Sequence, residues 1–179
     1  MALTFIGIRG GGKSTVAPLV ARALGRPYFD ADEELERRAG RTIREIFATE
    51  GESAFRALEV EVMRDLLASG DAVIAAGGGA VLSAQTRERI RRSGPAVYLR
   101  VSAETAERRI CADAATAERR PALSGLSLRD ELDATIAVRE PFYRECATIE
   151  IDCDAGSAAE LAEQVLHALP AEIRGEGST

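Results

Sequence analysis

The 179-residue sequence has no long apolar run and no surplus of basic residues, and each absence excludes a class of protein. A membrane-spanning helix needs about 20 mostly apolar residues, and no stretch approaches that length, so we expect no membrane partner. No basic segment followed by an apolar run opens the chain, which argues against export. The formal net charge is −6, so the basic surplus that neutralises nucleic-acid phosphates is missing and we expect no nucleic-acid partner.

Cysteine and histidine are scarce, and asparagine is absent. The three cysteines, Cys111, Cys146 and Cys153, do not have metal-ligand spacing, and their odd number favours free, buried thiols in a cytoplasmic protein. The single histidine, His167, receives no functional role. The lack of asparagine excludes the N-K-x-D motif of GTPases. No segment indicates an assembly interface, so we expect a monomer.

The sequence does contain a regular alternation of short apolar strands and amphipathic helices. This alternation predicts an α/β protein, with a parallel sheet covered by helices on both faces. We expect a single domain over residues 1–170 and a tail over 171–179. The expected strands are 3–8, 27–29, 72–76, 96–101 and 148–152. The expected helices are 13–24, 32–40, 42–51, 53–70, 83–94, 102–110 and 157–169, together with the stretch 127–146, which we expect to be helical only as far as Pro141.

A glycine-rich stretch, GIRGGGKST, lies between the first strand and the first helix. It matches G-x-x-x-x-G-K-[ST], a phosphate-binding loop. Backbone N–H groups in such a turn face one concavity, and the following helix adds its positive end. Lys13 is placed to bind the β- and γ-phosphates, and the Ser14 hydroxyl to bind Mg²⁺. We therefore predict a nucleoside triphosphate site built from Gly10, Gly11, Gly12, Lys13, Ser14 and Thr15.

The loop alone does not decide between an ATPase, a nucleotide kinase and a small-molecule kinase. Asp30 and Asp32 close the second strand, at the edge of the sheet where ligands bind in open α/β folds. Asp30 is a candidate to approach Mg²⁺ through water. Asp32 is a candidate to accept the proton of an acceptor hydroxyl, to orient that hydroxyl, or to cap the helix that follows.

Three further segments are candidates for the acceptor side. Arg56 and Glu59 either form a structural ion pair, or Glu59 orients Arg56 so that its guanidinium binds a carboxylate of the ligand. The triplet Gly77–Gly79 either permits close approach of a ligand to the backbone or forms a tight turn. The irregular segment 111–126 carries ERRPALSG. It has the length of a lid whose arginine closes over phosphates, although an isolated arginine there is typical of a solvated surface.

Taken together and in this order, these motifs resemble those of shikimate kinases. That family has a phosphate loop near the N-terminus, D-x-D after the second strand, F-R-x-x-E on a helix and G-G-G after the third strand. An R-P-x-L lid and a late arginine before Y-R-E complete the pattern. The resemblance covers roughly residues 3–152, with Asp30 and Asp32, Phe55, Arg56 and Glu59, Gly77–Gly79, Arg120, Pro121 and Leu123, and Arg139 before Tyr143, Arg144 and Glu145.

The resemblance implies Mg²⁺-dependent transfer of phosphate from ATP to the 3-hydroxyl of shikimate, in the route to chorismate and the aromatic amino acids. It implies a three-layer fold like that of nucleoside monophosphate kinases, with five parallel strands in the order 2-3-1-4-5. Asp32 would contact the acceptor hydroxyls, and Arg56 and Arg139 the shikimate carboxylate. Gly78 and Gly79 would help hold the ring, and Gly77 would also belong to the substrate site. Arg120 would be the lid arginine. The acceptor-binding region would span about 32–62 and the lid about 111–126.

The sequence also departs from the family pattern. The lid usually reads R-P-L-L, but here Ala122 replaces the first leucine, and the segment before it is longer than usual. The arginine that stacks on adenine is therefore either Arg109, our preferred candidate, or Arg108, and Arg119 can exchange roles with Arg120. Two alternatives stay open: another small-molecule kinase of this fold, such as a gluconate kinase, and an ATP-binding module without turnover.

Overall fold

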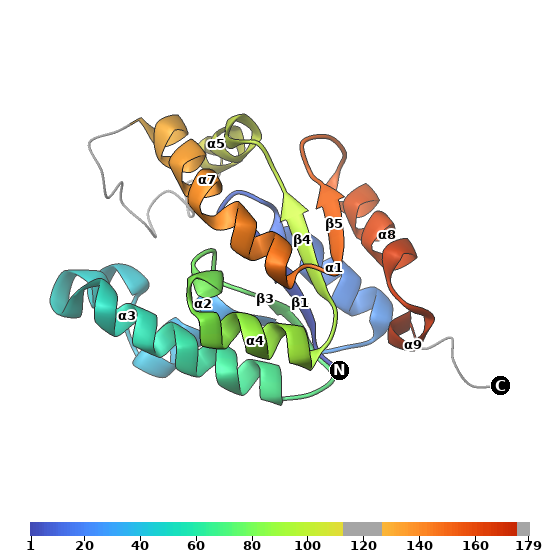
Figure 1. Ribbon diagram of the computed structural model, residues 1–179, viewed down its shortest axis with the longest axis horizontal. Coiled ribbons are helices and arrows are strands. Elements are labelled where there is room, and N and C mark those ends of the chain that lie inside the picture. Colours follow the sequence, from blue (N-terminus) through green and yellow to red (C-terminus); the bar gives the residue numbers. More distant parts are fainter. Residues whose placement is uncertain (113–126, 175–179) are drawn as a thin grey trace.

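The computed structural model describes residues 1–112 and 127–174, and its centre is a parallel sheet (Figure 1). Its five strands run in the order β2-β3-β1-β4-β5, which confirms the fold and the strand order expected from the sequence. In sheet order the strands are β2 (Tyr28–Asp30), β3 (Val73–Ala75), β1 (Leu3–Ile6), β4 (Ala96–Arg100) and β5 (Ile149–Asp152).

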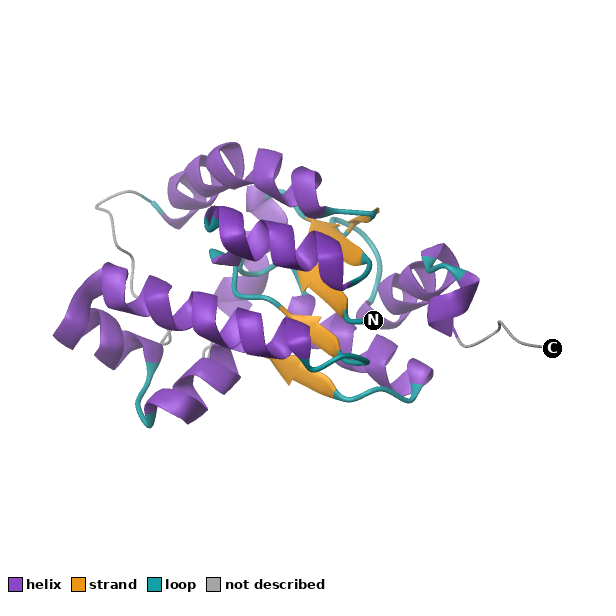
Figure 2. Ribbon diagram, turned by 60° about the horizontal axis from the view of Figure 1, so that its bottom comes forward, coloured by secondary structure: helices purple, strands orange, loops and turns teal. Residues whose placement is uncertain are grey.

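Helices cover both faces of this sheet (Figure 2). Helices α1 and α8 pack against each other on one face, and α3, α4 and α7 form the layer on the other. The helices are α1 (Lys13–Leu24), α2 (Ala31–Ala39), α3 (Ile43–Ala68), α4 (Ala84–Ser93), α5 (Ala103–Ala112), α7 (Leu128–Cys146), α8 (Ala158–Ala168) and α9 (Ala171–Arg174), with a 3₁₀ turn, η1 (Ala80–Leu82). None of the helices in the described ranges is both long and apolar enough to cross a membrane.

The central strand β1 positions the site. All four of its residues are buried, as expected for a strand covered by helices on both faces. It pairs in parallel with β3 and β4, with Leu3 opposite Val73 and Thr4 opposite Ala96. The carboxyl ends of β1, β2 and β3 therefore meet at one edge, where the glycine-rich loop, the two aspartates and the glycine triplet follow directly.

The start of α2 differs from the sequence-based expectation. Asp30, rather than Asp32, is the N-cap: its Oδ1 accepts hydrogen bonds from the backbone N–H groups of Asp32, at 2.9 Å, and Glu33, at 3.3 Å. Asp32 instead lies in the first turn of α2. The first backbone N–H groups of a helix have no partner within the helix, and a side chain two or three positions before them caps the helix best. Asp30 has that position. The side chain of Asp32 is thus not used as the cap.

The two predicted helices, 42–51 and 53–70, form the single helix α3, which is kinked between them. Gly51 between them has φ 80° and ψ 179°, a conformation that suits glycine because it lacks a Cβ. The first segment begins with a complete capping box, in which Thr42 and Glu45 satisfy each other's backbone N–H groups. The second segment carries Arg56 and Glu59.

Helix α7 does not stop at Pro141, as the sequence suggested, but continues to Cys146. Proline removes one backbone hydrogen bond inside a helix, here the bond to the carbonyl of Ala137. Both Ala137 and Pro141 are exposed, so water can solvate the freed carbonyl. Burial of Leu132, Tyr143 and Cys146 holds the two halves of the helix against the core.

The expected tail and the cysteines are only partly as predicted. Residues Ala171–Arg174 form the short helix α9, whose Ile173 is buried and accepts a hydrogen bond from Arg26 Nη2 at 2.9 Å. All three cysteines are free thiols, as expected. Cys146 and Cys153 are buried, whereas Cys111, in the last turn of α5, is exposed.

Candidate active site

The glycine-rich loop leaves β1 and wraps over the start of α1. Gly10 and Gly12 have φ of 75° and 91°, which residues with a side chain rarely adopt. A Cβ on Gly10 would come within 2.8 Å of the Ala106 carbonyl oxygen, so the loop also needs glycine to pack against α5. Lys13 Nζ donates to the carbonyls of Gly7 and Ile8 at 2.8 and 2.9 Å. These bonds hold the ammonium along the inside of the loop.

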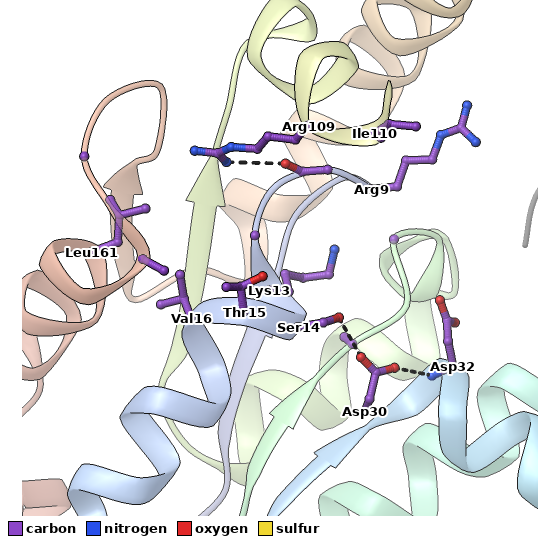
Figure 3. Close-up of a pocket in the computed structure, with 16 residues that line it drawn as sticks. Arg9, Lys13, Ser14, Thr15, Val16, Asp30, Asp32, Arg109, Ile110 and Leu161 are labelled. Atoms are coloured by element: carbon purple, nitrogen blue, oxygen red, sulfur yellow. Dashed lines mark hydrogen bonds between the residues drawn. The ribbon is translucent and has the colours of Figure 1, made fainter. Parts of the chain in front are cut away.

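A cavity of about 470 Å³ opens in front of this loop (Figure 3). Of the predicted site residues, the cavity is lined by Gly10, Gly12, Lys13, Ser14, Thr15, Asp30, Asp32, Gly78 and Arg109. The residues that line this cavity do not include Gly11, Arg56, Gly77, Gly79 or Arg139. The described residues therefore bring the nucleotide half and Asp32 into one cavity, with the arginines beside it.

Ser14 and Asp30 meet at the floor of the cavity (Figure 3). The Ser14 hydroxyl donates to Asp30 Oδ2 at 2.7 Å, and the Tyr28 hydroxyl donates to the same oxygen at 3.3 Å. Burial, and next the charge of Asp30, raise the pKa of Tyr28, so that hydroxyl remains a donor. A hydroxyl and a carboxylate oxygen this close are the hard oxygen ligands that suit Mg²⁺, which also keeps water and phosphate oxygens as ligands. These residues fit the predicted metal site.

Asp32 lies beside the glycine triplet and close to a second carboxylate. A Cβ on Gly77 would come within 2.8 Å of Asp32 Oδ1 and 2.7 Å of Glu59 Oε1. Glu59 is buried, with 4% of its surface exposed. A side chain on Gly77 would therefore displace two carboxylates, one from α2 and one from α3.

Arg56 is oriented by two acidic residues of its own helix. Its Nη1 donates to Glu59 Oε2 at 2.7 Å, and its Nη2 to Glu52 Oε1 at 3.1 Å. Burial alone would lower the pKa of Arg56, but the charges and hydrogen bonds of Glu59 and Glu52 outweigh burial and raise it. A Cβ on Gly79 would lie 2.8 Å from Arg56 Cζ. The guanidinium therefore lies against the third glycine of the triplet.

Arg139 reaches the middle glycine from α7. Its Nη1 donates to the Gly78 carbonyl at 2.9 Å, and the Tyr143 hydroxyl donates to the same oxygen at 2.6 Å. The triplet thus contacts Asp32 and Glu59 at Gly77, Arg139 at Gly78 and Arg56 at Gly79. Sequence reasoning placed these groups at one site, and the structure brings them around one short loop.

Arg109 lines the opposite end of the cavity (Figure 3). Its Nη2 donates to the Cys153 carbonyl at 2.6 Å, and its Nη1 to the Gly10 carbonyl at 3.3 Å. Its neighbour Arg108 is exposed and does not line the cavity. The segment 113–126, with Arg119 and Arg120, lies outside the described residues, as does most of the predicted lid.

Several cavity residues were missed in the sequence. Ile110, Gly156, Ala158 and Leu161 line the end of the cavity near Arg109. Three of the four follow β5, and a signal was available, because the carboxyl end of that strand is at the same edge of the sheet. Arg9, at a variable position of the loop motif, also lines the cavity, and its Nη2 pairs with Glu131 Oε1 on α7 at 3.1 Å.

Comparison with known proteins agrees with this geometry. Residues 9–170 match the family model for shikimate kinase. The chain belongs to the shikimate kinase family. A shikimate kinase of Symbiobacterium thermophilum is 40% identical over 176 residues, which cover 98% of this chain and 99% of the relative. A shikimate kinase structure from Acinetobacter baumannii, in complex with shikimate, superposes with a TM-score of 0.87 at 36% identity and covers 93% of this chain and 90% of that one.

A gluconokinase of Sinorhizobium meliloti shares the fold but is more distant than these shikimate kinases. It superposes with a TM-score of 0.55 at 18% identity, and the match covers 93% of this chain and 90% of that one. At this identity the likeness concerns the fold alone. The gluconate kinase alternative is therefore disfavoured relative to the shikimate kinase family.

Proposed function

We propose that the protein transfers the γ-phosphate of ATP to the 3-hydroxyl of shikimate, giving shikimate 3-phosphate and ADP on the route to chorismate and the aromatic amino acids. The observation that carries this proposal is the placement of Asp32. Its carboxylate lines the same cavity as Lys13 and Ser14, and it touches the glycine triplet on which the two arginines converge. A carboxylate with two arginines nearby is the combination that suits a hydroxylated, carboxylate-bearing acceptor.

The reaction follows from these positions. The phosphate loop binds the ATP phosphates through backbone N–H groups, and the Lys13 ammonium lies beside them. Asp32 accepts the proton of the acceptor hydroxyl while the hydroxyl oxygen forms a bond to the γ-phosphorus. The bond from that phosphorus to the bridging oxygen breaks, and its electron pair leaves with ADP. Positioning and charge stabilisation by the protein account for the rate, because little other chemistry is required.

The acceptor is held by its carboxylate. Arg56, fixed by Glu59 and Glu52, and Arg139, fixed by the Gly78 carbonyl, both bind this group, and Gly77, Gly78 and Gly79 support the ring. Arginine suits this role because its planar fork matches a carboxylate. The region of residues 32–62 supplies Arg56 together with Glu52 and Glu59, which orient it.

The Ser14 hydroxyl and Asp30 Oδ2 would hold Mg²⁺, Asp30 through water, together with the phosphates of ATP. When bound, Mg²⁺ neutralises charge on the phosphates. Arg109 would stack on the adenine, and Arg120 would act from a lid over about 111–126 that lies outside the described residues. We further propose a cytoplasmic monomer of one catalytic domain, over residues 1–170, with no nucleic-acid partner.

One assay tests the function. Purified protein is supplied with ATP, Mg²⁺ and shikimate, and ADP release is followed by a coupled reaction, with gluconate as the alternative acceptor. We expect turnover with shikimate, none with gluconate, and none with Lys13→Ala. Turnover with gluconate would assign a different acceptor. ATP binding measured by calorimetry without turnover on either acceptor would make the protein a nucleotide-binding module.

A further inference from the structure

The carbonyl oxygen of Gly78 accepts two hydrogen bonds from one face of α7. Arg139 Nη1 donates at 2.9 Å and the Tyr143 hydroxyl at 2.6 Å. The two side chains are four positions apart on the helix, so they project from the same face. Tyr143 has no role of its own in the sequence motifs, yet it is among the largest fully buried side chains of the described residues.

This carbonyl controls the direction of a neighbouring donor. The Gly78 carbonyl and the Gly79 N–H belong to one planar peptide unit and point in opposite directions across it. Because the carbonyl is turned toward α7, the Gly79 N–H is directed away from α7. Gly79 is also the residue against which the Arg56 guanidinium lies. The N–H and the guanidinium can thus serve one anionic group.

We propose that Tyr143 is a positioning residue for the acceptor. Its hydroxyl holds the Gly78 carbonyl and so fixes the orientation of the peptide between Gly78 and Gly79. The same carbonyl is the acceptor for Arg139, so the position of Arg139 is fixed as well. The Gly79 N–H and the Arg56 guanidinium beside it then present a preorganised site to the acceptor carboxylate, while Arg139 is held at the carbonyl side of the same peptide. This inference rests on the proposed function, because it assigns Tyr143 to the binding of that same acceptor.

The surroundings of Tyr143 suit a fixed donor. Its ring stacks on that of Tyr98 from β4, with centroids 5.1 Å apart and an interplanar angle of 23°, so the hydroxyl has little freedom to move. Burial raises the pKa of Tyr143 well above its usual range, although the nearby charge of Arg139 lowers it. The hydroxyl therefore remains protonated and donates throughout the range in which a kinase works.

The test removes this hydroxyl and keeps the ring. Tyr143→Phe deletes the bond to Gly78 while preserving the stack, and Tyr98→Phe is the matched control, because it deletes a hydroxyl from the other ring. Calorimetry gives the Kd of shikimate and, separately, of ADP for each protein. We expect Tyr143→Phe to raise the shikimate Kd by about 3- to 10-fold, as the loss of one hydrogen bond allows. The ADP Kd of both variants and the shikimate Kd of Tyr98→Phe should match the wild type.

A second ligand separates positioning from a general loss of packing. The carboxamide analogue of shikimate lacks the negative charge that the proposed site recognises. The ratio of the amide Kd to the shikimate Kd is measured on each protein, so a destabilised, partly unfolded sample does not distort it. We expect this ratio to fall about 3- to 10-fold in Tyr143→Phe, because the variant loses affinity for the carboxylate alone.

The outcomes are distinct. An unchanged shikimate Kd in Tyr143→Phe, or equal losses for shikimate and its amide, would overturn the positioning role and leave Tyr143 as a core residue. A wild-type protein that binds no shikimate would instead refute the proposed function, before any variant is considered.

Discussion

The guanidinium of Arg56 lies against the Cα of Gly79, so closely that a methyl group there would come within 2.8 Å of Cζ. The backbone of Gly79, with φ −99° and ψ −5°, is open to any residue. Its lack of a side chain therefore serves the arginine rather than the turn. Gly79→Ala would push aside the end of a long, flexible side chain while the backbone keeps its conformation.

We expect Gly79→Ala to raise the KM for shikimate about tenfold or more, because the displaced guanidinium loses a charged hydrogen bond worth roughly 1.5–3 kcal/mol. The KM for ATP and the melting temperature should stay near the wild-type values. Steady-state kinetics with each substrate varied in turn provides the check. In an Arg56→Ala background the same substitution should add little, since both changes act on one contact; fully additive effects would show that Gly79 acts independently of Arg56.

Asp32 lies in the first turn of α2 and is not its cap. Replacing it with asparagine should therefore spare the fold and remove the proton acceptor. We expect Asp32→Asn to lower kcat by about 100-fold or more, as general-base loss typically does, with an unchanged melting temperature. Single-turnover kinetics together with circular dichroism measures both. A wild-type kcat would remove Asp32 from the chemistry.

Asp30 combines two tasks on its two oxygens: Oδ1 caps α2 and Oδ2 accepts from Ser14. Asparagine caps a helix as well as aspartate does, whereas alanine does not. Asp30→Asn should thus keep the stability of the protein but raise the Mg²⁺ concentration needed for half-maximal rate. Asp30→Ala should show the same Mg²⁺ effect and also lose about 0.5–2 kcal/mol of unfolding free energy.

The comparison of these two Asp30 variants separates capping of α2 from binding of Mg²⁺, because only one variant loses the cap. Urea unfolding and Mg²⁺ titration of the rate are the two measurements. Equal Mg²⁺ dependence in the wild type and Asp30→Asn would place the metal elsewhere, whatever the stabilities show.

Glu34 contributes a pH dependence to the stability of the protein. Hydrogen bonds from Arg37, and next from Arg38, lower the pKa of its carboxyl to about 2. Because the folded pKa lies below the unfolded value of about 4.3, the stabilisation is complete above that value and is lost as the pH falls toward 2. Glu34→Gln should be less stable than the wild type at pH 7, by about 1 kcal/mol or less for a largely superficial pair.

The difference between the two proteins should vanish near pH 2. Denaturant melts at pH 7, 4 and 2 follow it, and Glu33→Gln removes the same charge from the same turn as a control. A difference that stayed constant with pH would mean that the contacts of Glu34 with its two arginines do not stabilise the fold through its charge.

Local chemistry made most of the fold and the nucleotide half of the site predictable. The phosphate loop, its strand and its helix are contiguous in the chain, and the motif itself predicts the glycines, whose positive φ at Gly10 and Gly12 the structure shows. The alternation of strands and helices fixed the layers, and the resemblance to shikimate kinases supplied the strand order.

The misses arose where partners are distant in sequence. Arg9 faces Glu131, and Tyr143 faces Gly78, across separations that no local pattern encodes. Pro141 was expected to end a helix, but the helix continues through it. The two features that allow this, the exposure of Ala137 and the burial of Tyr143, are properties of the folded protein that the sequence does not show. Asp32 was expected to cap α2, since either aspartate satisfies the pattern and only the backbone shows which one does.

The place of β1 at the centre of the sheet has a consequence for biosynthesis. The first strand to leave the ribosome pairs only with the third and fourth, so it waits, without a neighbour, until the chain has been made as far as β3. Arg139 and Tyr143 emerge later still. Gly156, Ala158 and Leu161, which line the nucleotide end of the cavity, emerge last. Translation therefore completes neither half of the enzyme until the last strand and the helix after it have been made.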